Sequence, residues 1–230
     1  MNNKIDVLDG GYIRLVDTLG DDASVVNAAR VSYDKEIEVL EERDEKLMVW
    51  LWKNEHTSPF RHAALTFEVY APLFVARQWW KYAVGSSHVD DQNGWNESSR
   101  RYITENEEFY VPMDTEWRSK PENSKQGSGE PVEEFIGKEL TDKLIKTISL
   151  GTSLYHEAMD AGVAPELARL FLPAYGMYVR WRWTVSLHGA MHFIQQRVEH
   201  DAQKEIQDYA KATRDLVATA FPTTSRIFLQ

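Results

Sequence analysis

The chain has 230 residues, of which 43% are hydrophobic and 27% charged, so it can bury a sizeable core and has an ordinary globular composition. It has no cysteine, which excludes disulfides, zinc–thiolate sites, iron–sulfur clusters and a cysteine nucleophile. A net charge of −10 argues against non-specific nucleic-acid binding, and the lack of a signal peptide or long apolar run predicts a cytoplasmic protein without a membrane segment.

The chain begins with short apolar runs on either side of Gly10 and Gly11, a pattern that predicts two short strands joined by a turn. Acidic residues then stand at the start of two apolar-periodic segments, where the helix dipole favours them. We therefore expect a short helix capped by Asp21 and Asp22, and a longer helix from residue 41 or 42 to about 54.

The middle of the chain changes period several times. Apolar and polar residues alternate over 62–70, which predicts a strand, and Pro72 is expected in the first turn of a helix over 73–84. Residues 85–101 lack any period and are expected to form a loop. Segment 112–131 is rich in Pro, Gly and Ser, and we interpret it as a surface loop within one domain.

The C-terminal part predicts more helix. A helical stretch runs over 131–160, and Pro165 restarts a helix. A strand is expected over 177–186, then a helix capped by Ser186 and a further helix from Ala202. The prediction is an α+β fold: a mainly helical single domain, spanning all 230 residues, with a small, mostly antiparallel sheet.

One candidate ligand site begins on the predicted helix ARQWWKY. Gln78 and Lys81 share a face of this helix, while Trp79 and Trp80 are expected in the core. A polar face of this kind is equally often a solvated edge. Ligand binding is favoured because the helix leads into WNESSRRY (95–102), whose guanidinium forks and hydroxyls suit a phosphate and whose carboxylate suits a sugar hydroxyl. The candidate residues of this run are Glu97, Ser98, Ser99, Arg100 and Arg101.

Further candidates lie near the C-terminus. Arg169 stands among apolar residues that are expected to be buried, so it must pair with an acid or bind a ligand. Arg197 stands late on the helix that Ser186 begins, and free N–H groups at that start can meet an anion. His188 and His192 share a face of the same helix, but this spacing alone is a weak metal signal and no metal is expected.

Together these stretches resemble the flavin-dependent thymidylate synthases. The resemblance follows the family's order and covers most of the chain, through NAARVSYD, ERDEKLMVWLWKNEHTSPFRHAALTF, APLFVARQWW, WNESSRRY, PELARLFLP, RWTVS and QRVEHDAQKEIQ. It implies a homotetramer with active sites at subunit interfaces. It also implies reductive methylation of dUMP to dTMP, with 5,10-methylenetetrahydrofolate as one-carbon donor and NADPH as hydride source through FAD. The implied mechanism needs no enzyme cysteine.

The sequence departs from the family's R-H-R signature, whose matching positions are Lys81, Tyr82 and Ala83. The imidazole becomes a phenol and the last position loses its donors, so FAD must be held differently. His88, from a longer loop, is the expected substitute. The family's downstream histidine sits one place early, as His200, and its role stays open.

The resemblance implies two groups of site residues. The nucleotide group comprises Gln78, Lys81, Glu97, Ser98, Ser99, Arg100, Arg101, Arg169 and Arg197, with Arg197 as the catalytic cation at the uracil edge. The flavin group comprises Ser58, Lys81, Tyr82, His88, Glu97, Ser186, His188 and His192, with Ser32 as a weaker candidate. The altered signature leaves an alternative open: a non-catalytic nucleotide-binding protein derived from that fold.

Overall fold

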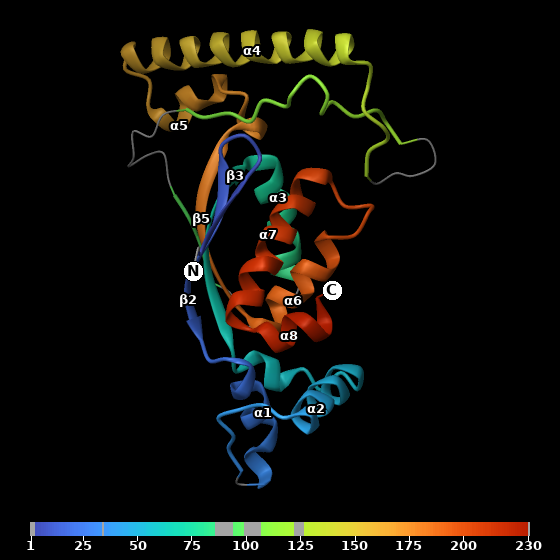
Figure 1. Cartoon of the computed structure of the whole chain (residues 1–230). Coiled ribbons are helices and arrows are strands. Elements are labelled where there is room, and N and C mark those ends of the chain that lie inside the picture. Colours follow the sequence, from blue (N-terminus) through green and yellow to red (C-terminus); the bar gives the residue numbers. More distant parts are fainter. Residues whose placement is uncertain (1–2, 34, 86–93, 99–106, 122–126, 230) are drawn as a thin grey trace.

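The structure, a computed structural model, describes residues 3–33, 35–85, 94–98, 107–121 and 127–229. As predicted, it is an α+β fold with a small antiparallel sheet. The strand order is β1-β2-β3-β5-β4, and helices cover one face of the sheet (Figure 1). The strands are β1 Lys4–Val7, β2 Gly11–Leu19, β3 Ala64–Pro72, β4 Gly94–Glu97 and β5 Tyr178–Ser186. The helices are α1 Asp22–Arg30, α2 Glu42–Lys53, α3 Leu73–Gly85, α4 Glu134–Asp160, α5 Pro165–Ala168, α6 Leu187–Arg197, α7 Lys204–Ala220 and α8 Pro222–Phe228. Short 3-10 turns are η1 Val31–Tyr33, η2 Ser58–Arg61, η3 Arg169–Phe171 and η4 Ala174–Gly176.

The predicted N-terminal hairpin and the caps of the first and sixth helices are confirmed. Asp21 caps α1 by accepting from the Ser24 backbone N–H at 2.8 Å, and Ser186 caps α6. The turn needs Gly11, because a Cβ there would lie 1.9 Å from the hydroxyl of Tyr209 on α7. That hydroxyl donates to the carbonyl of Tyr70 at 2.7 Å, so this glycine lets α7 lie directly on the sheet.

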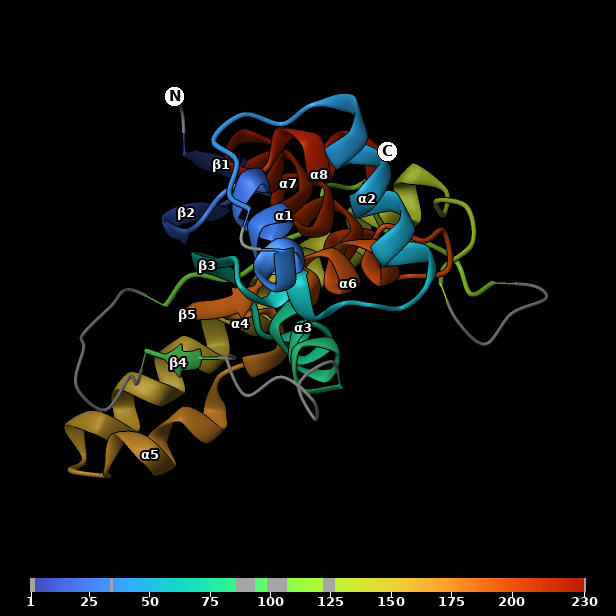
Figure 2. The same cartoon turned by 90° about the horizontal axis from the view of Figure 1, so that it is seen from below.

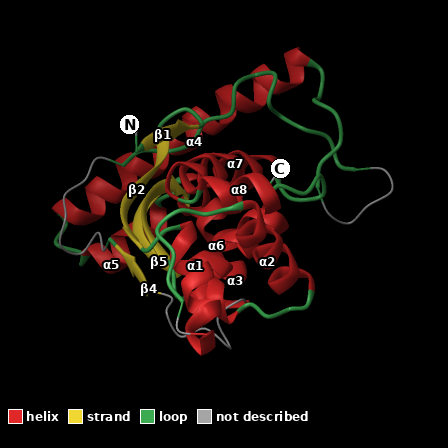
Figure 3. Cartoon of the chain, turned by 60° about the horizontal axis from the view of Figure 1, so that its bottom comes forward, coloured by secondary structure: helices red, strands yellow, loops and turns green. Residues whose placement is uncertain are grey.

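The core lies between the sheet and helices α3, α6 and α7 (Figure 3). Phe67 of β3 and Trp183 of β5 face this layer, with ring centroids 5.7 Å apart. Trp79 of α3 stacks on Phe193 of α6 at 4.3 Å. All four side chains are fully buried, so the alternation predicted along both strands places their aromatic residues at the centre of the core.

The prediction of an unbroken loop over 85–101 is wrong for residues 94–97. They form β4, the edge strand in Figure 2, and Trp95 stacks on Trp181 of β5 at 5.0 Å. Pairing with a distant strand stabilises this segment, and a local pattern does not show such a partner.

Several other expectations need correction. Pro72 ends β3, opposite Tyr178, and the helix begins after it. Trp80 is 49% exposed, packing edge-on against Trp95 instead of entering the core with Trp79. The long helix begins at Glu134 and α7 at Lys204, each a few residues later than predicted, and α8 was not predicted.

The long helix α4 crosses the top of the molecule, apart from the helical layer (Figure 1). Its only buried residues are Gly137 and Gly151. The expectation that the apolar residues around Arg169 are buried is wrong for most of them, because Leu170 is 78% exposed and Leu167 and Phe171 are also exposed. Among the described residues, no helix combines the length and apolar character that crossing a bilayer requires.

Candidate active site

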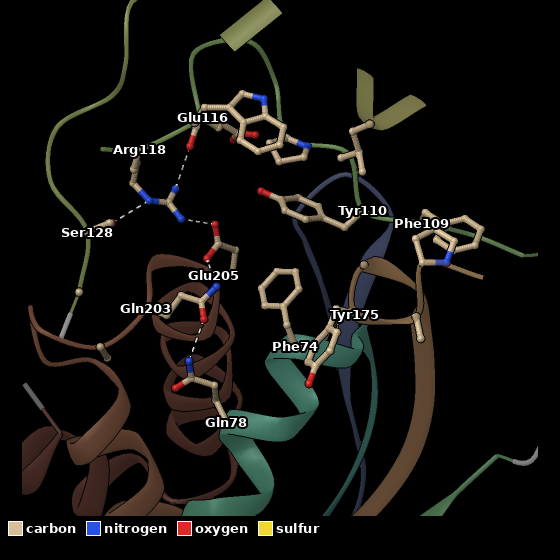
Figure 4. Close-up of a pocket in the computed structure, with 18 of the residues that line it drawn as sticks. Phe74, Gln78, Phe109, Tyr110, Glu116, Arg118, Ser128, Tyr175, Gln203 and Glu205 are labelled. Atoms are coloured by element: carbon tan, nitrogen blue, oxygen red, sulfur yellow. Dashed lines mark hydrogen bonds and ion pairs between the residues drawn. The ribbon is translucent and has the colours of Figure 1, made fainter. Parts of the chain in front are cut away.

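A cavity of about 940 Å³ opens between α3, the residues before α7 and the segment that leads into α4. Aromatic side chains form much of its wall, including Phe74, Tyr110 and Tyr175. The opposite side is lined by the polar side chains Gln78, Gln203, Glu205 and Arg118 (Figure 4). A concave, largely apolar site with a few convergent polar groups is typical of a small-molecule site.

One end of the cavity is cationic. Lys81 and Tyr82 reach it from the last turns of α3, and Arg197 reaches it from the end of α6. The guanidinium carbon of Arg197 lies 3.6 Å from the centroid of the Tyr82 ring, a cation–π contact that holds it in place. Arg197 is 8% exposed, and this burial lowers the pKa of its guanidinium. The ordinary pKa of an arginine is so high that the group stays charged. The result is a fixed, poorly hydrated positive charge facing a cavity.

Gln78 lies about one helical turn before Lys81 and Tyr82 on α3, and it lines the same cavity. Its side-chain amide donates to the Gln203 oxygen at 2.7 Å. The structure therefore brings together four of the predicted residues: Gln78, Lys81, Tyr82 and Arg197.

The donor-rich run is only partly described. Ser99, Arg100, Arg101 and His88 lie outside the described residues. Glu97 ends β4 and is exposed as a whole, although partial burial of its carboxyl raises its pKa. The backbone N–H of Ser98 donates to the Arg180 carbonyl at 2.8 Å, which ties the start of the run to β5. Neither of these two residues lines the cavity.

Arg169 lies apart from the cavity. It is exposed in the η3 turn beside the apolar residues of α5, and its Nε donates to the Glu166 carbonyl at 3.1 Å. Within one chain, Arg169 therefore does not join the cluster at Arg197.

The flavin-group residues near the start of α6 also lie away from the cavity. Ser186 is fully buried and accepts from the Gly189 backbone N–H at 3.1 Å, so its hydroxyl serves the helix. His188 is half-buried, 5.8 Å from the Trp52 ring, and Ser58 is exposed in the η2 turn. Among the described residues, no group of three or more His, Cys, Asp or Glu is placed to hold a metal ion.

His192 interacts electrostatically with Arg197 at the end of α6. Burial lowers the pKa of its imidazole, and the positive charge of Arg197 lowers it further. These two groups are therefore close enough to sense each other, and the imidazole is neutral near pH 7.

We expect NMR titration to find the His192 midpoint below the usual 6.5, and Arg197→Ala to raise it. Because the folded pKa is the lower one, the unfolded chain binds more protons between the two values. The contribution of His192 to stability therefore decreases as the pH drops below about 6.5. A midpoint that does not move in Arg197→Ala contradicts this coupling.

The sequence did not single out three side chains of the cavity wall: Arg118, Gln203 and Glu205. Arg118 forms an ion pair with Glu205, which is 4% exposed in the first turn of α7. The segment containing Arg118 was interpreted as a surface loop, and its only sequence signal was an arginine beside Trp117.

Comparison with known proteins gives a consistent result. The family model described as "Thymidylate synthase complementing protein" matches residues 14–223. The flavin-dependent thymidylate synthase of Thermosipho africanus is 37% identical over 224 residues, covering 97% of this chain and 93% of that protein. The one of Wolbachia pipientis wMel is 36% identical, covering 97% of this chain and 75% of that protein. A crystal structure of the UMP/dUMP methylase PolB from Streptomyces cacaoi, bound with 5-Br dUMP, has a TM-score of 0.81 and 27% identity, covering 98% of this chain and 97% of that one.

Proposed function

Because this chain belongs to the flavin-dependent thymidylate synthase family, we propose that the cationic end of the cavity, with Gln78, Lys81 and Arg197, is its dUMP site. The protein is a methyltransferase that converts dUMP to dTMP. Its one-carbon donor is 5,10-methylenetetrahydrofolate, and NADPH provides the hydride through FAD. The alternative of a non-catalytic binding protein is not favoured by these relatives.

The observation that carries the site proposal is the contact of the buried Arg197 guanidinium with the Tyr82 ring. A fixed cation in a site that excludes water stabilises negative charge better than one in bulk solvent. Placed against the uracil edge, Arg197 favours the negative charge that develops on the ring and so activates C5. Lys81 adds a second positive charge, which suits the phosphate of a nucleotide.

Two of the flavin candidates, Lys81 and Tyr82, lie at the same end of the cavity. The phenol of Tyr82 and the ammonium of Lys81 offer hydrogen-bond donors where the family's R-H-R signature stands. His188 and His192 offer imidazoles on α6, outside the cavity of the single chain. When bound, FAD supplies hydride-transfer chemistry. We propose that these four residues hold it, together with Glu97, Ser58 and the predicted His88; buried Ser186 serves through the helix start that it caps.

The remaining nucleotide contacts are proposed for the donor-rich run, with Ser98, Ser99, Arg100 and Arg101 binding phosphate and sugar. We also propose that the chain forms a single cytoplasmic domain.

We propose a homotetramer whose active sites combine residues of different copies. Arg169 is separated from the cavity of its own chain and stands on a face of exposed apolar residues, so a second copy is the occupant that completes both. Exposed apolar residues occur along α4 and in the segment around Arg169: Phe135, Ile136, Ile145, Leu150, Val163, Leu167, Leu170 and Phe171. Exposed apolar residues that gather on a protein surface often mark an interaction site.

Leu170→Glu is expected to shift the protein from tetramer to smaller species in size-exclusion chromatography with light scattering, because it places a charge in an apolar interface. Leu19→Glu is the matched control, since Leu19 is 65% exposed at the end of β2, away from this face. A Leu170→Glu variant that remains tetrameric contradicts the proposed interface.

The function is tested by tritium release from dUMP labelled at C5, with 5,10-methylenetetrahydrofolate, NADPH and FAD present. A working enzyme must release this tritium when the C5 hydrogen leaves. Binding of dUMP without FAD uptake and without tritium release would instead support the non-catalytic alternative.

A further inference from the structure

Four side chains of the cavity wall form one continuous hydrogen-bonded chain (Figure 4). Gln78 donates to Gln203 at 2.7 Å, and Gln203 donates to Oε2 of Glu205 at 2.8 Å. The other carboxylate oxygen of Glu205 accepts from Arg118. Arg118 in turn donates to Ser128 Oγ at 2.9 Å and to the Glu116 carbonyl at 3.2 Å.

The carboxylate of Glu205 determines which group donates and which accepts at each step of this hydrogen-bonded chain. The carboxylate of Glu205, paired with a guanidinium, can only accept hydrogen bonds. Gln203 must therefore turn its NH₂ group toward Glu205 and its oxygen toward Gln78. Gln78 must then turn its own NH₂ group toward Gln203, and only one of the two orientations of each amide satisfies every partner.

The chain ends at the proposed nucleotide site. Gln78 precedes Lys81 by one helical turn, and both line the cavity with Arg197. With its NH₂ group directed at Gln203, Gln78 keeps one N–H and its carbonyl oxygen for other partners, and Figure 4 shows that oxygen directed away from Gln203. A ligand therefore meets a side chain whose rotamer and polarity are already set, which reduces the entropic cost of binding.

Burial makes the chain rigid. Glu205 is 4% exposed, and both of its carboxylate oxygens have partners, so the buried charge is satisfied. Arg118 is held by three acceptors from three different residues. Such a satisfied network specifies one arrangement of its members.

Resting on the proposed function, we propose that Gln203, Glu205 and Arg118 are positioning residues that set the affinity for dUMP by fixing the orientation of Gln78. This assigns a role to Arg118, which lies in a segment that the sequence analysis interpreted only as a surface loop. The same segment packs against α4 at the buried Gly137. A Cβ at Gly137 would lie 1.8 Å from the Asp114 carbonyl, so that glycine lets the segment rest on α4.

The first test is Glu205→Gln. Glutamine can donate or accept at this position, so the direction of the chain is no longer fixed, and the ion pair with Arg118 is lost. We expect the dUMP dissociation constant of the FAD-loaded protein to rise about fivefold, the effect of one hydrogen bond, with a larger change in KM than in kcat. Gln203→Ala, which removes the middle link at a half-buried position, is expected to act similarly.

Two comparisons separate positioning from a general structural effect. In a Gln78→Ala background, Glu205→Gln should not weaken dUMP binding further, because the chain acts through Gln78. Asp208→Asn makes the same acid-to-amide change on α7 at a residue that pairs with Lys204 outside the cavity, and dUMP affinity should stay unchanged. Equal weakening by Glu205→Gln with and without Gln78 would overturn the proposal.

Crystal structures of the nucleotide-free protein keep this test separate from the proposed function. If the wild-type protein binds no dUMP, the proposed function fails. The hydrogen-bond network is still expected in that case: one Gln78–Gln203 contact in the wild type, which is absent or present in two orientations in Glu205→Gln. A wild-type crystal structure in which Gln78 points away from Gln203 overturns the positioning chain, whatever the nucleotide result.

Discussion

Replacing Arg197 by alanine is expected to lower the rate of tritium release from 5-tritiated dUMP by about a hundredfold or more, the effect of removing one preorganised charge-stabilising group. The reason is positional: Arg197 is 8% exposed and its guanidinium carbon lies 3.6 Å from the Tyr82 ring centroid, so its charge is fixed and poorly hydrated. Rates are measured at saturating dUMP, which separates the chemical step from binding.

Two further variants sharpen this prediction. Arg197→Lys keeps the charge but loses the planar stacking on Tyr82, so its rate should lie between those of the wild type and Arg197→Ala. Arg226→Ala removes an exposed arginine that pairs with Glu45 at 2.6 Å on the surface, and it should leave the rate unchanged. A wild-type rate in a folded Arg197→Ala protein would exclude Arg197 from the reaction.

Replacing Trp79 by alanine is expected to lower the free energy of unfolding by about 3–5 kcal/mol, the usual cost of truncating a buried tryptophan. Trp79 is fully buried and stacks on Phe193 at 4.3 Å, with edge contacts to Trp181 at 5.5 Å and Trp183 at 5.4 Å. The loss therefore opens a cavity where α3, α6 and the sheet meet. Urea unfolding followed by circular dichroism measures it.

The adjacent Trp80 provides a matched control. It is 49% exposed and packs edge-on against Trp95, so Trp80→Ala should cost less than about 1 kcal/mol. Equal losses in the two variants would mean that the core is not centred on Trp79.

These two tryptophans also show what a sequence can and cannot predict. The helix that contains both was correctly predicted after Pro72, because local signals in the sequence mark where a helix begins. These signals did not distinguish their environments, which depend on Phe193 and Trp95 reaching them from distant segments. For the same reason the edge strand β4, paired with β5, was missed.

The same limit applies to the site. Gln78, Lys81 and Arg197 were predicted from local chemistry and from the family resemblance, and the fold places them on one cavity. The partnership of Arg118 with Glu205 joins residues 87 positions apart. In a chain with 26 basic and 36 acidic residues, no local pattern selects that pair from the many possible ones.

Arg169 presents a different case. Its apolar surroundings predicted burial, yet Leu170 beside it is 78% exposed in the single chain. The proposed tetramer would reconcile the pattern with the structure if a second copy covers these residues. An apolar sequence pattern indicates that residues are buried in the assembled protein, but it does not show whether the same chain or a second copy covers them.

The most direct test of the central claim is a crystal structure of the protein with dUMP and FAD. We predict uracil beside the Arg197 guanidinium and Gln78 in contact with the nucleotide, with Arg169 of another copy completing the site. A nucleotide bound elsewhere, with Arg197 and Arg169 facing unconnected surfaces in the assembly, would contradict the account.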